Sequence, residues 1–198
     1  FALPEKATSY EAGLKANWGL VTANVAVFKQ VIRDFQSNVF TGSGYFLGNA
    51  GEQSVFGIEF EGTVRPVKEL TLGMAWTYLD PKYDSYPNSA FGDATGLTPA
   101  NIPPLSATFT AQYDHTLANA DRLILYTSFH YESPVQTVEG LPGLIGRTAV
   151  TGAVDYQAGI NAACPFKREI DELNGSITYA MQNGLEFSLW GRNLLNDR

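Results

Sequence analysis

An alternation of apolar and other side chains recurs along almost the whole chain, and it is blurred where Ile124 and Tyr126 stand among the polar positions of residues 122–131. Between residues 54 and 65, Phe56, Ile58, Phe60 and Val64 share one face, and only Gly62 interrupts the row. Successive side chains of a strand point to opposite faces, so this period of two predicts strands and does not fit a helix. The segments with this pattern are residues 10–18, 21–27, 54–65, 70–79, 105–113, 122–131, 173–181 and 185–192.

Short and long connections alternate between these eight segments. The odd connections are short, and the last of them contains Asn183-Gly184, a strong hairpin signal. The even connections are long. The short ones span residues 19–20, 66–69, 114–121 and 182–184, and the long ones span roughly residues 36–52, 80–103 and 133–170. In an up-and-down sheet, odd and even connections lie at opposite ends, so the sequence predicts tight turns at one end and long loops at the other.

Charge is scarce for a chain of 198 residues. Charged residues make up 17% of the sequence, against roughly 25% in a typical soluble domain. The net charge of −7 and the lack of a basic stripe exclude a nucleic-acid partner. No run of about 18 apolar residues is present, which excludes a transmembrane helix.

Two classes of β protein fit the alternation. A soluble β-sandwich or ligand-binding barrel would have short strands and a charge-rich outer face. Here the polar face is instead rich in Thr, Ser, Asn, Gly and Ala, and strands such as 54–65 reach the ~9 to 11 residues that cross a bilayer. Aromatic residues gather near strand ends, as in the girdles of membrane barrels. They are Trp18, Phe35, Trp76, Tyr78, Tyr113, Tyr131 and Tyr179.

The fold class that follows is all-β, an antiparallel up-and-down segment of a transmembrane β-barrel. Strands can span lipid only if their backbone groups are paired. The alternation leaves open whether the sheet closes on itself or is a sector of a larger barrel.

The sequence offers no constellation for chemistry. Ser128 and His130 lie two apart on one face without a third group to orient them, so we expect no enzyme. His115, His130 and Cys164 do not have the spacing of metal ligands, and we expect neither a metal nor a cofactor. Cys164 is interpreted as a loop thiol, with a partner outside this segment left open.

Several strings in order resemble the C-terminal barrel half of TonB-dependent outer-membrane receptors of the siderophore-receptor type. They include Pro-Glu-Lys followed by Tyr-Glu-Ala-Gly-Leu-Lys, and Trp-Gly-Arg-Asn-Leu near the end. The matching segments are Pro4 to Lys15, Phe28 to Gln36, Gly57 to Glu61, Leu70 to Asp84 and Trp190 to Leu194.

This resemblance implies a location in the bacterial outer membrane and a barrel of about 22 strands with a plugged lumen. Residues 1–198 would be a C-terminal barrel fragment without the plug domain and the final strand. The whole receptor would import a scarce nutrient, most often a ferric siderophore, with energy from the TonB system. Its partners would be outer-membrane lipid, the rest of the barrel, the plug domain, the TonB protein through the N-terminal part, and an iron chelate as ligand.

The resemblance also turns the usual assignment of the two faces around. The apolar face would meet lipid, and Glu59, Glu61, Arg65 and Arg192 would face the lumen, where they pair with one another or with the plug. The substrate-binding candidates lie in the long loop that follows Leu79, where aromatic rings among polar groups would stack on an organic chelate. They are Tyr83, Asp84, Tyr86, Phe91 and Asp93.

Two alternatives remain at this stage. A passive porin-like or adhesion barrel would show the same alternation without the ordered strings. A soluble β-sandwich binding module would bury the apolar face instead of exposing it to lipid.

Overall fold

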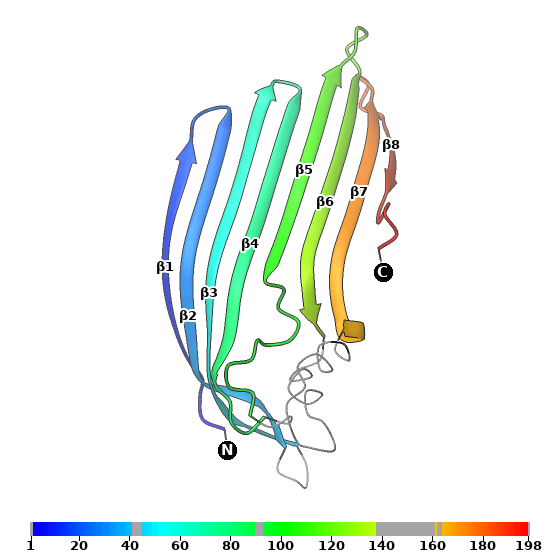
Figure 1. Cartoon of the computed structure of the whole chain (residues 1–198). Coiled ribbons are helices and arrows are strands. Elements are labelled where there is room, and N and C mark those ends of the chain that lie inside the picture. The colour runs from blue at the N-terminus through cyan, green and yellow to red at the C-terminus, as the bar shows by residue number, and fades with distance from the viewer. Residues whose placement is uncertain (1, 41–44, 90–92, 138–160, 162–163, 198) are drawn as a thin grey trace.

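The computed structural model describes residues 2–40, 45–89, 93–137, 161 and 164–197. They form one sheet of eight antiparallel strands, in which each strand pairs with the next along the chain (Figure 1). A short 3₁₀-helix, η1 (Cys164–Phe166), precedes β7. The strands are β1 (Lys6–Asn17), β2 (Val21–Phe40), β3 (Tyr45–Val67), β4 (Leu70–Ser85), β5 (Leu105–Thr116), β6 (Arg122–Gln136), β7 (Lys167–Ala180) and β8 (Glu186–Gly191). Among the described residues, no helix is long and apolar enough to cross a membrane.

The predicted strands are confirmed in number and order, but the predicted loop at residues 36–52 is wrong. β2 continues to Phe40 and β3 begins at Tyr45, and these two residues are partners in the ladder. The register shifts on both sides of Phe35, so the alternation is interrupted there although the strands continue. Three further strands are also longer than their patterns predicted, since β4 continues to Ser85, β6 continues to Gln136 and β7 begins at Lys167.

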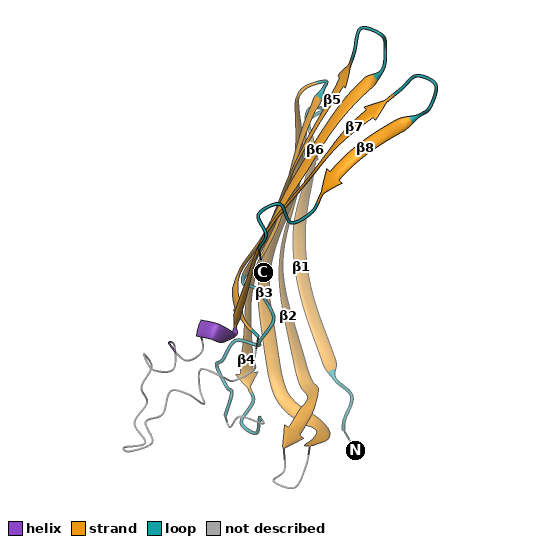
Figure 2. Ribbon diagram, turned by 90° about the vertical axis from the view of Figure 1, so that its right-hand side faces the viewer, coloured by secondary structure: helices purple, strands orange, loops and turns teal. Residues whose placement is uncertain are grey.

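The two ends of the sheet differ as the connection lengths predicted. Short turns join β1 to β2, β3 to β4, β5 to β6 and β7 to β8 at one end, which we call the turn end (Figure 1). The strand ends between which the longer connections run lie at the opposite end, which we call the loop end. Figure 2 shows the same division from the side. In the predicted Asn-Gly turn, Gly184 has a φ of 89° and its N–H donates to the Met181 carbonyl at 3.1 Å. Glycine adopts such a positive φ without the steric cost that a Cβ would bring, which explains the glycine at this position of the turn.

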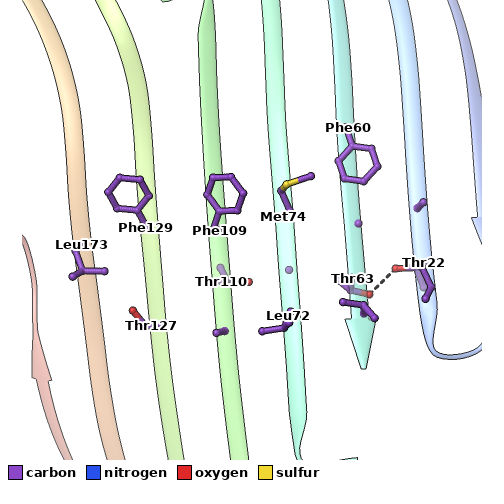
Figure 3. Close-up of a pocket in the computed structure, with 16 residues that line it drawn as sticks. Thr22, Phe60, Thr63, Leu72, Met74, Phe109, Thr110, Thr127, Phe129 and Leu173 are labelled. Atoms are coloured by element: carbon purple, nitrogen blue, oxygen red, sulfur yellow. Dashed lines mark hydrogen bonds between the residues drawn. The ribbon is translucent and has the colours of Figure 1, made fainter. Parts of the chain in front are cut away.

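One face of the sheet is apolar and largely uncovered. The register aligns apolar residues of neighbouring strands, such as Val25 with Phe60 and Phe60 with Trp76. Yet Phe109, Ile177 and Leu189 are 46%, 53% and 76% exposed. A depression of 590 Å³ on this apolar face contains Phe60, Met74 and Phe109 in its lining (Figure 3). An apolar surface of this extent requires a non-aqueous neighbour.

The other face carries small hydroxyl residues that bond across strands. Thr22 and Thr63 hydroxyls lie 2.6 Å apart on β2 and β3, and Thr178 and Ser188 hydroxyls lie 2.8 Å apart on β7 and β8. These pairs satisfy the side chains locally without forming an apolar core. The polar face therefore suits contact with water or with a polar partner.

Candidate functional site at the loop end of the sheet

A kink in the β2–β3 ladder shapes the loop end. Asp34 has a φ of 55°, and the register shifts between Arg33 and Phe35 and again after Phe35. On the partner strand, Gly51 has a φ of 147°, and a Cβ placed there would lie 1.9 Å from the Ser85 carbonyl oxygen. Bulges of this kind bend a strand and increase its twist. The far part of the β2–β3 hairpin bends at this kink (Figures 1 and 2).

Three aromatic rings pack together beside this kink. Phe35 stacks on Tyr83 with centroids 5.5 Å apart, and Tyr86 meets both rings edge-on at 5.2 and 5.1 Å. These distances are within the favourable range for aromatic pairs. Phe35, Tyr83 and Tyr86 are only 6%, 7% and 4% exposed. With Ala50 and Ala94 they form the mouth cluster, the buried core of the loop end.

The connection from β4 to β5 folds back onto the end of β4. The Tyr83 N–H donates to the Leu97 carbonyl at 3.0 Å, and the Ala94 N–H donates to the Tyr86 carbonyl at 2.9 Å. The Tyr86 hydroxyl donates to Ser37 Oγ at 3.0 Å, which joins this loop to β2. The loop is thus held in place by backbone bonds and by the mouth cluster.

A small polar network supports the same loop. The Tyr86 N–H donates to Thr95 Oγ1 at 2.9 Å, and the Thr95 N–H donates to Asp93 Oδ1 at 2.9 Å. Hydrogen bonds from the Thr95 hydroxyl and then from its N–H hold the pKa of Asp93 below its ordinary value. Asp93 therefore stays ionised and organises the turn.

The structure divides the predicted substrate-binding residues. Tyr83 and Tyr86 are buried in the mouth cluster, while Asp84 and Asp93 are exposed. Phe91 lies outside the described residues. Phe35 was predicted as a girdle aromatic, and this is wrong because it packs in the mouth cluster. Its partners Tyr83 and Tyr86 lie about fifty residues further along the chain, so the local pattern around Phe35 contained no sign of them.

The predicted lumen residues lie on or beside the polar face. Glu59 and Glu61 are exposed on β3, and Asn24 Nδ2 donates to Glu61 Oε2 at 3.5 Å. The Arg192 guanidinium lies 5.4 Å from the centre of the Trp190 ring. In the part of the chain that the structure describes, no ion pair joins Glu59, Glu61, Arg65 and Arg192.

His130 takes part in a chain of polar contacts across three strands. Thr108 Oγ1 lies 2.9 Å from His130 Nδ1, and His130 Nε2 lies 3.5 Å from Glu132 Oε1. Arg168 in turn donates to Glu132 Oε2 at 2.7 Å. Ser128, which the sequence paired with His130, is not a member of this chain of contacts. Across the described ranges, no group of three His, Cys, Asp or Glu side chains has the geometry to hold a metal ion.

Sequence reasoning missed a set of apolar side chains on the polar face at the loop end. Continuing the alternation of residues 21–27 beyond Val27 places Phe28 and Ile32 among the polar positions of β2. The same face carries Val55 on β3 and Leu79 on β4. An apolar residue in a polar row was the signal that could have found them.

Comparison with known proteins assigns a family to this architecture. The family model described as "TonB dependent receptor-like, beta-barrel" matches residues 2–194. The ferric yersiniabactin uptake receptor FyuA of Yersinia pestis is similar with 17% identity and a TM-score of 0.68, over 96% of this chain and 25% of that one. BauA, the ferric preacinetobactin receptor of Acinetobacter baumannii, has 20% identity and a TM-score of 0.66, over 98% of this chain and 26% of that one.

The name of a third similar solved structure mentions copper and not iron. The copper transporter OprC has 19% identity and a TM-score of 0.61, over 100% of this chain and 26% of that one. At these identities the solved structures support the fold alone. This chain spans about a quarter of the length of each of these three proteins.

Proposed function

This chain belongs to the TonB-dependent receptor β-barrel family, and from that premise we propose that it forms wall and capture loops of a receptor that imports a ferric siderophore with TonB energy. The family consists of bacterial outer-membrane transport proteins, so the chain lies in the outer membrane. The loop end then faces the outside of the cell and the turn end faces the periplasm, since barrels of this kind have short periplasmic turns. The apolar face meets lipid and becomes the outer face. The polar face becomes the inner face.

The observation that carries the proposal is the family match across residues 2–194, and the packed cluster that organises the loop end supports it. Long loops at the mouth of a barrel are suited to capture a solute when a rigid scaffold positions them. The mouth cluster fixes the β4–β5 loop against the β2–β3 hairpin, which supplies such a scaffold.

Within this function we assign roles to the predicted residues as part of the proposal. Asp84 at the end of β4 and Phe91 and Asp93 of the β4–β5 connection contact the chelate, and Tyr83 and Tyr86 hold that connection in place. Glu59, Glu61, Arg65 and Arg192 face the lumen and contact the plug domain. β1 and β8, the two edge strands of the sheet, pair with the remaining strands of the receptor.

Uptake of radioactive iron tests this proposal. Cells that produce the full receptor are given ferric chelates, in one strain with the TonB protein and in a matched strain without it. We expect accumulation of iron only when TonB is present. Equal uptake in both strains would instead identify a passive porin-like barrel.

A second experiment separates iron from copper as the cargo, since relatives with either word in their names share the fold. Purified receptor is titrated calorimetrically with ferric chelates and with copper salts. Heat of binding for the ferric chelates alone is the expected result. Binding of copper alone would contradict the siderophore assignment.

A further inference from the structure

A trough in the apolar outer face lies closer to the turn end than to the loop end. It is the depression of 590 Å³ drawn in Figure 3, and we call it the outer-face trough. The register makes Met74, Phe109 and Phe129 direct partners on β4, β5 and β6. In Figure 3 their side chains form one row with Phe60 of β3. These four large side chains form one side of the trough.

The floor of the trough is low because the next row toward the turn end carries short side chains. Ala111 and Thr127 are partners on β5 and β6, and both line the trough. The row after that is large again, since Tyr113 and Leu125 are partners there. The floor therefore lies between two rows of larger side chains.

The Phe60 ring is held in place at one end of the trough. It stacks on Trp76 with centroids 6.0 Å apart and an interplanar angle of 19°. A Cβ placed on Gly62 would lie 2.8 Å from Phe60 Cζ, so the ring lies over the glycine backbone. Offset stacking of this kind is favourable for aromatic pairs. This part of the wall thus has little freedom to lose when a ligand packs against it.

Three polar side chains of the lining have partners within the sheet. The Thr127 hydroxyl donates to the Asn174 carbonyl at 2.9 Å. The Thr22 and Thr63 hydroxyls lie 2.6 Å apart. A polar group left unpaired in hydrocarbon is costly. These bonds therefore suit the trough to a purely apolar ligand.

The trough lies in the half of the membrane that is next to the periplasm. At the turn end of β5, the Tyr113 and His115 rings stack with centroids 6.0 Å apart, and rings of this kind mark a membrane interface. Phe109 is four residues from Tyr113, which is about 13 Å along a strand and less along the membrane normal because the strands tilt. Half of the hydrocarbon core is about 15 Å thick. The adjoining leaflet of an outer membrane consists of phospholipid.

We infer that the outer-face trough holds one acyl chain of a phospholipid from the periplasmic leaflet. This inference rests on the membrane placement in the function proposed above and is independent of the cargo. The trough is continuous with the outer face that meets lipid, which makes a lipid chain its occupant. Because hydrocarbon already surrounds that face, an apolar ligand gains nothing from leaving water, and its retention depends on close packing. The fixed aromatic wall and the low floor supply that packing.

Photo-crosslinking of the full receptor tests the inference. Purified receptor is placed in vesicles of phosphatidylethanolamine and phosphatidylglycerol that contain a trace of phosphatidylethanolamine with a diazirine in the middle of one acyl chain. After illumination, mass spectrometry locates the labelled residues. Ala111→Phe fills the trough, and Ala111→Leu fills it in part if the first variant does not fold. Ile177→Phe is the control, because Ile177 is 53% exposed on the same face and does not line the trough. Heat-modified gel mobility checks that each barrel is folded.

The expected result is strong labelling of Met74 and Phe109 in wild type and in Ile177→Phe. In Ala111→Phe this labelling should fall at least about fivefold, equivalent to about 1 kcal/mol. In wild type it should also exceed the labelling of Leu125 in the row nearer the periplasm, because a retained chain reacts with its own site more often than a fluid chain does.

Four outcomes would overturn the inference. Equal labelling of Met74, Phe109 and Leu125 that does not change in Ala111→Phe would mean that only fluid lipid covers the outer face, and the proposed function would stand. Loss of the label when lipopolysaccharide is added would identify lipid A as the occupant. Links between two receptors through the trough, without lipid label, would identify a second copy. Label on Glu59 instead of the outer face would contradict the membrane placement itself, and the proposed function would fail with it.

Discussion

The outer and inner faces of the same sheet follow different rules. On the outer face, apolar side chains repeat from strand to strand, and residues such as Phe109 and Leu189 remain exposed for lipid to cover. On the inner face at the loop end, Phe28, Phe35 and Tyr83 break the polar row and pack against residues distant in sequence. Any apolar side chain suits contact with lipid, whereas each apolar side chain on the inner face must fit the particular residues that it packs against.

The largest effect is expected from Phe35→Ala, which removes the centre of the mouth cluster. Loss of a buried phenylalanine costs about 3–5 kcal/mol of folding free energy, and Tyr83 and Tyr86 would lose their common partner. The measurement is the free energy of unfolding of the receptor in phospholipid vesicles by guanidinium titration. Tyr86→Phe, which removes only the bond to Ser37, should cost about 0.5–1.5 kcal/mol. Similar costs for both variants would mean that the inner mouth has no specific core.

The next effect compares adjacent residues of β3 that point to opposite faces. Ile58→Arg places a charge on the outer face near the middle of the membrane and should cost about 2–4 kcal/mol. Glu59→Gln on the inner face should cost little, because Glu59 is exposed and belongs to none of the ion pairs among the described residues. The same vesicle titration ranks the two variants. A larger cost for Glu59→Gln than for Ile58→Arg would contradict contact between the apolar face and lipid and would favour a soluble β-sandwich.

A smaller effect is expected from matched glycines on the two faces. Gly57→Ala on the inner face forces the Phe28 ring to move, since the new Cβ would lie 2.1 Å from it, and crowding of this kind typically costs about 1–3 kcal/mol. Gly175→Ala on the outer face meets its nearest atom at 3.5 Å, which is an ordinary contact, and should be neutral. Adding Phe28→Leu to Gly57→Ala should recover part of the loss, because the two residues touch. Equal costs for the two glycine variants would remove the distinction between the faces.

The same difference explains how far sequence alone could predict the fold. The outer-face rows and the Asn183-Gly184 turn were predicted because a period of two and a turn dipeptide are local signals. The extensions of β2 beyond residue 36 and of β3 back to Tyr45 were missed because the bulge at Asp34 and Phe35 interrupts that period. The burial of Tyr83 and Tyr86 was missed because their partner Phe35 is remote in sequence. Long-range packing on the inner face leaves no periodic trace.

The smallest effect is expected at the turn end of the outer face, where a carboxylate joins two turns. Asp121 accepts hydrogen bonds from the Tyr179 hydroxyl at 2.5 Å and from the Gln182 N–H at 3.1 Å. These bonds, the one from the Tyr179 hydroxyl first, lower the pKa of Asp121 below its ordinary value.

A lowered pKa means that the ionised carboxylate stabilises the folded state above the unfolded pKa of about 3.9, and that this contribution is lost as the pH falls through the folded value. Wild type should therefore lose stability below about pH 4 more steeply than Tyr179→Phe, which lacks the main cause of the shift. Guanidinium midpoints measured for both proteins between pH 7 and the acid range give the comparison, and because other carboxylates such as Asp93 titrate alike in both, the difference reports Asp121. Parallel pH profiles would mean that local backbone bonds alone hold the two turns. In that case the specific contact between Asp121 and Tyr179 would add no stability to the outer face.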